Sequence, residues 1–318
     1  MIGSVRRHAA QGLPIYVLLL ALMVVTGALS SDFRDPANLQ NLADRTAPLA
    51  VLALGQTIVI LVGGIDLSVG AMVSVATVVL SFTGRDPTIG LLPALVAVLA
   101  IGLTLGVVNG LGVVALRLDP LIMTLASSAV MQGLALFLRQ SPGGMIDRPF
   151  ADMLGQRPLG VPVGFLLALV LFALIWTLLS YTRAGRAMYA VGGNLEFARE
   201  SGIGVDRTRL LAYVLASLLA AVAGILLAAR IYSGDPVVGN SMTLDSIAAA
   251  IVGGTPFPGG AGGPVGTLGG ATLLAIVGNV LNMLAVSSYF QYILKGLILA
   301  SALVFFFYRR RETTNALA

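Results

Sequence analysis

A single aspartate, Asp66, stands between two apolar stretches of the chain. An ionised carboxylate in hydrocarbon is costly unless it is paired or hydrogen-bonded. Intramembrane carboxylates and glycine-interrupted spans both mark transport pathways. Two roles therefore stay open for Asp66, a functional site within a membrane or a cap for the following helix from inside a turn that is either hydrated or buried in protein. The surrounding motif, residues 63–70, contains Gly63, Gly64, Asp66, Ser68 and Gly70.

Catalytic chemistry finds little support elsewhere in the sequence. The chain has no cysteine and one histidine, His8, which excludes disulfides, thiolate metal sites and Ser-His-Asp hydrolysis inside a membrane. A nucleotide-binding P-loop needs a lysine after its glycines, whereas the only lysine, Lys295, lies in an apolar stretch and is expected to snorkel to an interface. We expect no enzyme, no cofactor and no metal, and any ATP hydrolysis must come from a separate polypeptide.

Uncharged amides are scattered through the apolar stretches. One interpretation is hydrogen bonding between helices, at about 0.6–2 kcal/mol each. The other is a path for a neutral polyhydroxylated solute, because amides both donate and accept hydrogen bonds without carrying a charge. The sequence does not separate the two interpretations. The candidate path residues are Gln56, Asn109, Gln132, Asn279 and Asn282.

A basic segment at 182–207 contains the pattern of a short capped helix. Asn194 is a good N-cap, and Gly202 is a good residue to follow the helix end. A helix of two turns is unstable alone, so it must be ordered by docking. We interpret the segment as a loop that couples the chain to a partner protein, and the alternative is a solvated linker. The coupling residues are Asn194, Leu195, Glu196, Phe197, Arg199, Glu200 and Ser201.

The elements that must position these residues are membrane spans. The chain has 318 residues, of which 57% are hydrophobic and only 10% are charged, with a mean hydropathy of +0.95. Allowing about 20 apolar residues per crossing, and fewer where glycine or proline intervenes, predicts an all-α polytopic membrane protein with about ten helices. The arginines flank the spans and form no stripe, which argues against nucleic-acid binding. The predicted spans are 13–30, 46–62, 67–83, 91–116, 121–138, 161–181, 208–229, 245–254, 265–285 and 290–307.

Charge placement predicts that both termini are cytoplasmic. The segments assigned to the cytoplasm hold eleven arginines against six acidic residues, and those assigned outside hold seven against eight. This excess of arginine on one side is the usual mark of the cytoplasmic face.

An inverted internal repeat is also expected, with half-repeats at about 13–138 and 161–308 in a single transmembrane domain covering 1–318. Asp44-Arg45-Thr46 precedes the second span as Asp206-Arg207-Thr208 precedes the seventh. We further pair Asp66 with Asp245, each as the opening residue of a span, and Asn109 with Asn279. An offset of five spans inverts the topology, an arrangement found in transporters.

The motif at 63–70 resembles the monosaccharide branch of bacterial ABC importer permeases, the ribose, xylose and galactose group related to branched-chain amino acid permeases. The resemblance extends through 190–194, 201–203 and 245–255 and covers roughly 45–308. It implies a fold like that of type II ABC importers and a homodimeric or heterodimeric pore in the bacterial inner membrane. It also implies ABC ATPase subunits docking around 195–201 and a periplasmic or lipid-anchored solute-binding protein outside.

The sequence therefore predicts the membrane permease of an ATP-driven importer for a monosaccharide or related polyol. Two alternatives stay open. One is an ion-coupled secondary transporter with Asp66 as the ion site, since such transporters also use inverted repeats. The other is an ABC permease for nucleosides or branched-chain amino acids.

Overall fold

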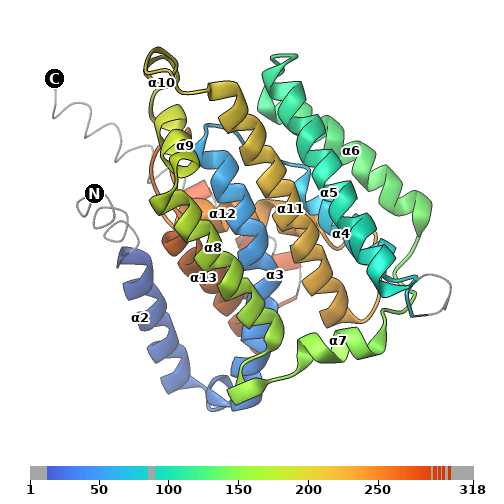
Figure 1. Ribbon diagram of the computed structural model, residues 1–318. Coiled ribbons are helices and arrows are strands. Elements are labelled where there is room, and N and C mark those ends of the chain that lie inside the picture. The colour runs from blue at the N-terminus through green and yellow to red at the C-terminus, as the bar shows by residue number, and fades with distance from the viewer. Residues whose placement is uncertain are drawn as a thin grey trace.

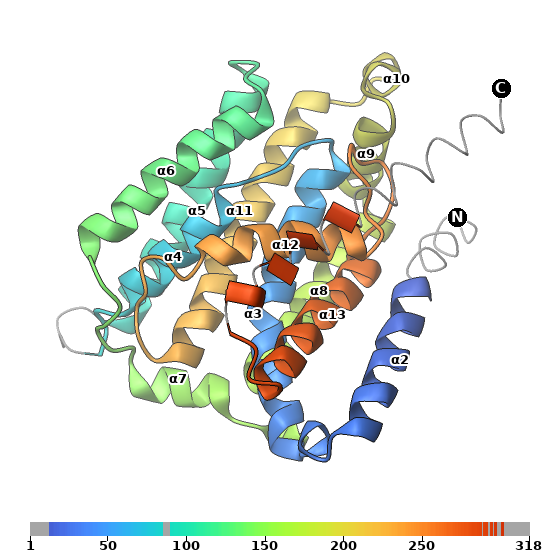
Figure 2. The ribbon, with the colours of Figure 1, turned by 180° about the vertical axis from the view of Figure 1, so that it is seen from behind.

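The computed structural model describes residues 13–84, 90–287, 289–291, 293, 294, 296, 297, 300 and 301. Within these residues the regular structure is helical, apart from one isolated antiparallel bridge between Gly143 and Gly234. Figures 1 and 2 show the bundle from opposite sides. The elements are α2 (Leu13–Leu29), η1 (Asp32–Arg34), α3 (Pro36–Leu61), α4 (Val69–Leu80), α5 (Leu91–Val114), α6 (Pro120–Leu138), α7 (Arg148–Gly155), η2 (Pro158–Gly160), α8 (Val163–Tyr181), α9 (Arg183–Gly193), α10 (Leu195–Glu200), α11 (Val205–Ile231), α12 (Asn240–Val252) and α13 (Pro264–Met283).

Six described helices, α3, α5, α6, α8, α11 and α13, are long and apolar enough to cross a membrane. Helices α2 and α4 match predicted spans but are shorter than the six, and α12 overlaps the eighth predicted span, 245–254, in part. The tenth predicted span, 290–307, and Lys295 within it lie largely outside the described residues. The described part thus supports an all-helical membrane protein, and the count of ten crossings stays a prediction.

Helices α3 and α11 form the centre of the bundle and are mostly buried. They are antiparallel: the start of α3 and the end of α11 line one pocket, while Gly55, nearer the end of α3, lies against Ala216 in the first half of α11. A Cβ on Gly55 would come within 3.0 Å of the Ala216 carbonyl oxygen, so the two backbones approach closely. Small residues allow such contact between helices in lipid.

Helices α5, α6 and α8 surround this centre and expose apolar faces. Their exposed side chains include Val96, Leu103, Val130 and Leu174. Exposed leucine and valine are expected on a lipid-facing surface, because there is no hydrophobic penalty for contact with acyl chains. These three helices are therefore the lipid-facing wall of the described bundle.

Two spans, which we call the interrupted spans, begin with a non-helical segment and continue as a short helix, α4 in one and α12 in the other. The two interrupted spans pack against each other. Residues 62–68 are non-helical and lead from α3 into α4, and residues 232–239 lead from α11 into α12. Ile65 and Leu67 of the first segment pack on Ile247 and Ile251 of α12. The second segment runs along α4, where Thr77 hydrogen-bonds the Asp235 backbone and Ser74 accepts from Gly239 N at 3.0 Å.

Glycine is required where the two short helices meet. A Cβ on Gly70 of α4 would come within 2.1 Å of Thr243 Oγ1 and 2.3 Å of Gly239 O. The N-terminal ends of α4 and α12 therefore touch through backbone atoms (Figure 2).

Three sequence expectations need correction. The second span begins at Pro36, ten residues early, because Asp35 caps it by accepting from Ala37 N and proline suits the first helical turn. Helix α12 begins at Asn240, so Asp245 lies inside it and does not open it as Asp66 precedes α4. The segment 182–207 is no simple loop, because it contains α9 in addition to the expected short helix.

Candidate functional site

The motif loop at 63–70 is held from within by its own aspartate. Asp66 is completely buried, and its Oδ1 accepts hydrogen bonds from Ser68 N at 2.8 Å and Ser68 Oγ at 2.6 Å. Asp66 therefore orders the turn that leads into α4. The N-cap residue itself is Ser68, so Asp66 supports the helix start through Ser68 and does not cap it directly. Gly63 has a φ of 81°, a conformation that glycine adopts without steric cost.

Side chains from three helices complete a polar cluster around this loop. The Gln56 amide of α3, oriented to satisfy both of its ends, donates to Asp66 O at 3.0 Å and accepts from Asp66 N at 3.2 Å. Asn109 of α5 donates to Ser68 Oγ at 2.8 Å and accepts from Ser127 of α6. Thr124 of α6 accepts from Leu67 N at 3.1 Å. The non-helical backbone is thus satisfied by side chains, as a buried loop in a membrane protein requires.

Tyr213 of α11 closes the cluster from the centre of the bundle. It is 1% exposed, and its hydroxyl lies so close to Gly64 that a Cβ there would come within 2.4 Å of it. Among the described residues, neither the Tyr213 hydroxyl nor Asp66 Oδ2 has a hydrogen-bond partner. Sequence reasoning missed Tyr213, Ser127 and Thr124. A tyrosine hydroxyl in an otherwise apolar span was the available signal, because buried tyrosines usually find a polar neighbour.

The five amides proposed for a solute path do not gather around one cavity. Gln56 and Asn109 are fully buried and bind the motif loop, as described above. Gln132 donates to Pro236 O at 2.8 Å, and Asn279 donates to Asn38 of α3 at 2.8 Å. Asn282 is exposed and accepts from Gln291 at 2.9 Å. Their role in a solute path stays a prediction, and each also has a partner within the chain.

Helix α10 lies at one end of the bundle, opposite α7 (Figure 1). The Asn194 side chain caps it by accepting from Phe197 N at 2.9 Å, and Gly202 follows with a φ of 76°. Ala198 faces inward and is buried, whereas Phe197 is 68% exposed. Glu196, Arg199, Glu200 and Ser201 are exposed as well, and Leu195 is half-buried. The expected short helix is therefore present, with an apolar side chain turned outward at its centre.

Helix α9 ties α10 to the interrupted spans. A Cβ on Gly192 would come within 1.7 Å of Leu61 O at the end of α3, so the two backbones touch. Leu61 O itself accepts from Gly260 N at 3.1 Å, in the glycine-rich loop between α12 and α13. Tyr189 donates to Gly262 O at 2.9 Å in the same loop, and burial raises the pKa of Tyr189 to about 12.

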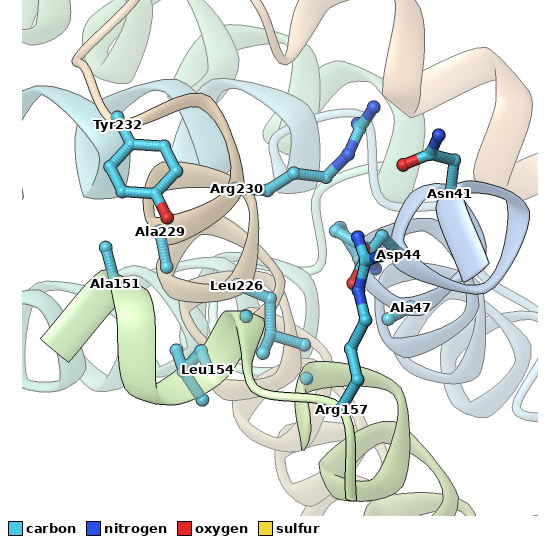
Figure 3. A pocket seen from close by; sticks show the side chains of 13 residues that line it. Asn41, Asp44, Ala47, Ala151, Leu154, Arg157, Leu226, Ala229, Arg230 and Tyr232 are labelled. Atoms are coloured by element: carbon cyan, nitrogen blue, oxygen red, sulfur yellow. The ribbon is translucent and has the colours of Figure 1, made fainter. Parts of the chain in front are cut away.

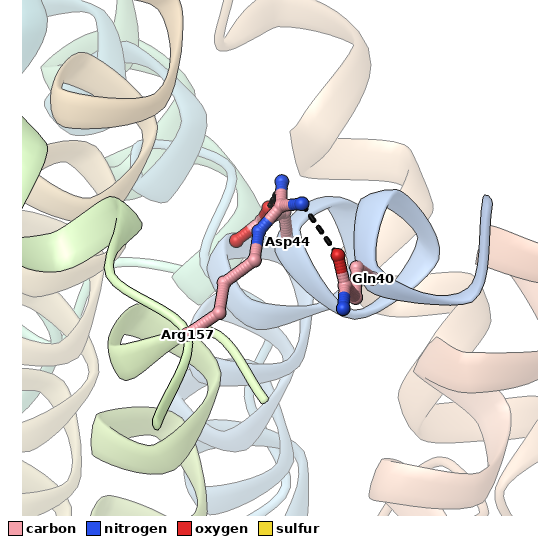
Figure 4. A network of polar contacts seen from close by, with 3 residues as sticks. All are labelled: Gln40, Asp44 and Arg157. Atoms are coloured by element: carbon pink, nitrogen blue, oxygen red, sulfur yellow. Dashed lines mark hydrogen bonds and ion pairs between the residues drawn. The ribbon is translucent and has the colours of Figure 1, made fainter. Parts of the chain in front are cut away.

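The opposite end of the bundle holds a pocket of about 330 Å³ (Figure 3). It lies between the start of α3, the end of α11, α7 and the start of α8. Arg157 bridges two of its walls by donating to Gln40 Oε1 at 2.5 Å and pairing with Asp44 at 3.4 Å (Figure 4). Tyr232 donates to Asp152 at 2.8 Å, and this bond to a carboxylate raises the pKa of Tyr232. These contacts fix α7 and the segment after it across the ends of the central helices.

Within the described residues no group of histidine, cysteine, aspartate and glutamate side chains is arranged to hold a metal ion. The candidate site is therefore a set of buried hydrogen bonds around interrupted spans, together with one exposed helix at the α10 end. This combination defines a membrane protein of the transporter class, because non-helical backbone at membrane depth is typical of solute routes.

Comparison with known proteins agrees with that class. Residues 38–303 match the family described as branched-chain amino acid transport system / permease component, and the chain belongs to this family. Its members are transport permease components and not enzymes.

Several relatives are similar over nearly their whole length. The chain is 38% identical to the ribose import permease protein RbsC of Escherichia coli (strain K12) over 294 residues, which cover 91% of each chain. It is 37% identical to the protein of the same name from Bacillus subtilis (strain 168), with 92% of each chain covered. It is 31% identical to the D-allose transport system permease protein AlsC of Escherichia coli (strain K12), with 90% of this chain and 89% of the relative covered.

Proposed function

We propose that this chain is the membrane permease of an ATP-driven importer for a monosaccharide or related polyol, with ribose as the first candidate. The observation that carries the proposal is the 38% identity to a ribose import permease across 91% of both chains. Similarity to a D-allose permease extends the candidates to hexoses. Uncharged amide and hydroxyl side chains within the spans suit such solutes, because these groups match sugar hydroxyls without a fixed charge.

Separate ABC ATPase subunits would dock on α10. The proposal is supported by the exposed Phe197, which presents an aromatic anchor among the charged side chains of Glu196, Arg199 and Glu200. Aromatic side chains surrounded by polar groups are typical of binding hot spots. A second permease copy would complete the pore, and a solute-binding protein would deliver the sugar at the α7 end.

The protein would lie in the bacterial inner membrane with the α10 end and both termini in the cytoplasm. Support comes from the arginines near α9, α10 and the start of α11, among them Arg183, Arg186, Arg199 and Arg207. An excess of arginine in short loops marks the cytoplasmic side.

The fold would be an inverted repeat of the type II ABC importer kind, within one domain spanning 1–318 and with half-repeats near 13–138 and 161–308. The antiparallel pair α3 and α11 supports this, as do the two interrupted spans that pack on each other. We revise one pairing. Asp235 is the counterpart of Asp66, because its Oδ1 accepts from Val237 N at 2.9 Å in the same two-residue turn ahead of a short helix.

Reconstitution tests the proposal. The chain, its ATPase and its solute-binding protein are placed in liposomes, and uptake of labelled ribose is measured with and without ATP. We expect uptake only with ATP and all three proteins, and competition by unlabelled sugars but not by nucleosides or leucine. Accumulation driven by a proton or sodium gradient in liposomes containing the chain alone would overturn the proposal, and competition by leucine would overturn the choice of cargo.

A further inference from the structure

The two interrupted spans differ in how much of their surface is buried by the rest of the protein. Every residue of α4 except Val79 is buried. Helix α12 is buried on all sides from Ser246 to Ile251, but its first turn and the segment before it are partly open. Val237 is 45% exposed, Leu244 is 57% exposed and Asn240 is exposed. We call this surface, made of Val237, Asn240, Ser241 and Leu244, the α12 face.

The α12 face begins deep inside the bundle. The segment 232–239 descends along α4 from Ser81, at the end of that helix, to Gly70 near its start. Eleven residues of helix correspond to about 16 Å. With the Ser81 end of α4 placed at the edge of a hydrocarbon layer about 30 Å thick, this distance puts Asn240 about halfway across it.

A polar, non-helical surface at that depth does not suit lipid. Most exposed positions in the middle of α5, α6 and α8 are leucine, valine and other apolar residues, and the exposed Thr104 donates to Ala100 O of its own helix, whereas the α12 face carries Asn240 and Ser241. Within the described residues the Asn240 side chain has no hydrogen-bond partner. Non-helical backbone at membrane depth is tolerated where it is enclosed by protein or borders water, and the exposure of Val237 shows that this segment is not enclosed on that side.

From these observations we infer that the α12 face borders the water-filled route of the solute and that the Asn240 amide contacts sugar hydroxyl groups there. The inference deepens the proposed function and rests on it for the identity of the solute. It assigns the route to the second interrupted span. The first contains the fully buried Asp66, and its helix α4 packs against α5 and α6, so we assign it a structural role. None of the four residues of the α12 face is among the amides selected from the sequence.

The absence of native cysteine makes a direct test possible. Single cysteines replace Asn240, Val130 and Ala71 in the complete transporter complex in liposomes. Val130 is 71% exposed on the apolar wall of α6, and Ala71 is a buried residue of α4. Each variant is treated with a charged, membrane-impermeant methanethiosulfonate, and the labelling rate is measured.

The expected result is labelling of Asn240→Cys at least about tenfold faster than of Val130→Cys or Ala71→Cys, because only an ionised thiol in water reacts. Saturating ribose in the complete complex should slow labelling of Asn240→Cys. A rate equal to that of Val130→Cys would overturn the inference.

The outcomes also separate this inference from the proposed function. Fast labelling of Asn240→Cys without protection by ribose, in a complex that does not import ribose, supports the water-filled route and rejects the sugar. ATP-driven ribose uptake in a complex whose Asn240→Cys is unreactive supports the proposed function and rejects the route. Asn240→Ala should raise the KM for uptake severalfold, while Thr104→Ala, on the exposed side of α5, serves as the control.

Discussion

Replacing Gly70 by alanine should force apart the two short helices that meet inside the bundle. The new Cβ would lie 2.1 Å from Thr243 Oγ1 and 2.3 Å from Gly239 O, whereas ordinary contact begins at 3.4 Å. The helices must therefore separate by about 1 Å, and overpacking of this kind costs about 1–3 kcal/mol.

A matched control isolates this steric cost. Gly133 lies within α6, and a Cβ there would meet nothing within 4 Å. Gly133→Ala should stabilise the protein by about 0.5–1 kcal/mol, because alanine loses less backbone entropy than glycine in a helix. Since both variants gain this propensity, the difference between them should approach the steric cost of about 1–3 kcal/mol.

Unfolding in mixed micelles, titrated with dodecyl sulfate, measures the free energy of unfolding of each variant. Gly70→Ala combined with Thr243→Ala should recover only part of the loss, because the Gly239 carbonyl is a backbone atom and stays in place. The reasoning is refuted if Gly70→Ala is as stable as Gly133→Ala. It is also refuted if the double variant regains full stability.

Three further predictions concern the motif loop, the exposed helix and the α9 contact. Asp66→Asn should be mild because an amide oxygen can still accept from Ser68, whereas Asp66→Leu leaves buried donors unpaired and should cost about 1–3 kcal/mol per donor; equal unfolding free energies would contradict this. Phe197→Ala should abolish co-purification of the ATPase without loss of stability, because the side chain is exposed, while Ala198→Leu in the buried position should destabilise the fold; retained ATPase binding by Phe197→Ala would count against the docking site. Because burial raises the pKa of Tyr189 from 10.0 to about 12, the unfolded chain loses this proton first, and stability should fall as the pH rises from 10 to 12; Tyr189→Phe should reduce that slope, and an unchanged slope would exclude the effect.

Lipid contact explains which helices the sequence predicted well. Helices α5, α6 and α8 expose apolar faces, so their composition is mostly apolar and their ends lie within two residues of the predicted ones. Asp119 followed by Pro120 marks the start of α6, where the carboxylate accepts from Leu121 N at 2.9 Å. Asn194 marks the start of α10 in the same way. These local capping signals need no knowledge of the tertiary structure.

Contact with protein explains the errors. The first turns of α3 and α12 contain polar residues such as Asn38 and Asn240, which read as loop in a hydropathy profile. Asn38 is paired with Asn279 across two helices, and no local pattern reveals that pairing. The match of Asp66 with Asp245 failed for a related reason, because the two interrupted spans differ in the number of residues before their helices and spacing alone cannot identify the equivalent aspartate.

The polar cluster around Asp66 was predictable only in part. The motif and the burial of its carboxylate followed from the sequence, since an aspartate between apolar stretches must find partners. The identity of the partners did not follow, because Ser127 and Tyr213 come from distant helices and are brought together only by packing. The sequence also could not show whether each amide bonds to a neighbouring helix or faces a solute path, because that depends on which side of its helix is packed against protein.

The contact at Gly192 restricts how force can travel through the molecule. Three backbone segments meet at Gly192 without space for a methyl group on that residue. They are the end of α9, the end of α3 at Leu61 and the turn at Gly260. Because these backbones are in direct contact, a displacement of α9 would be passed to the end of α3 and to the loop after α12 together. If the proposed ATPase docks on α10, its motion would therefore reach both interrupted spans through one backbone contact and not through a series of side chains.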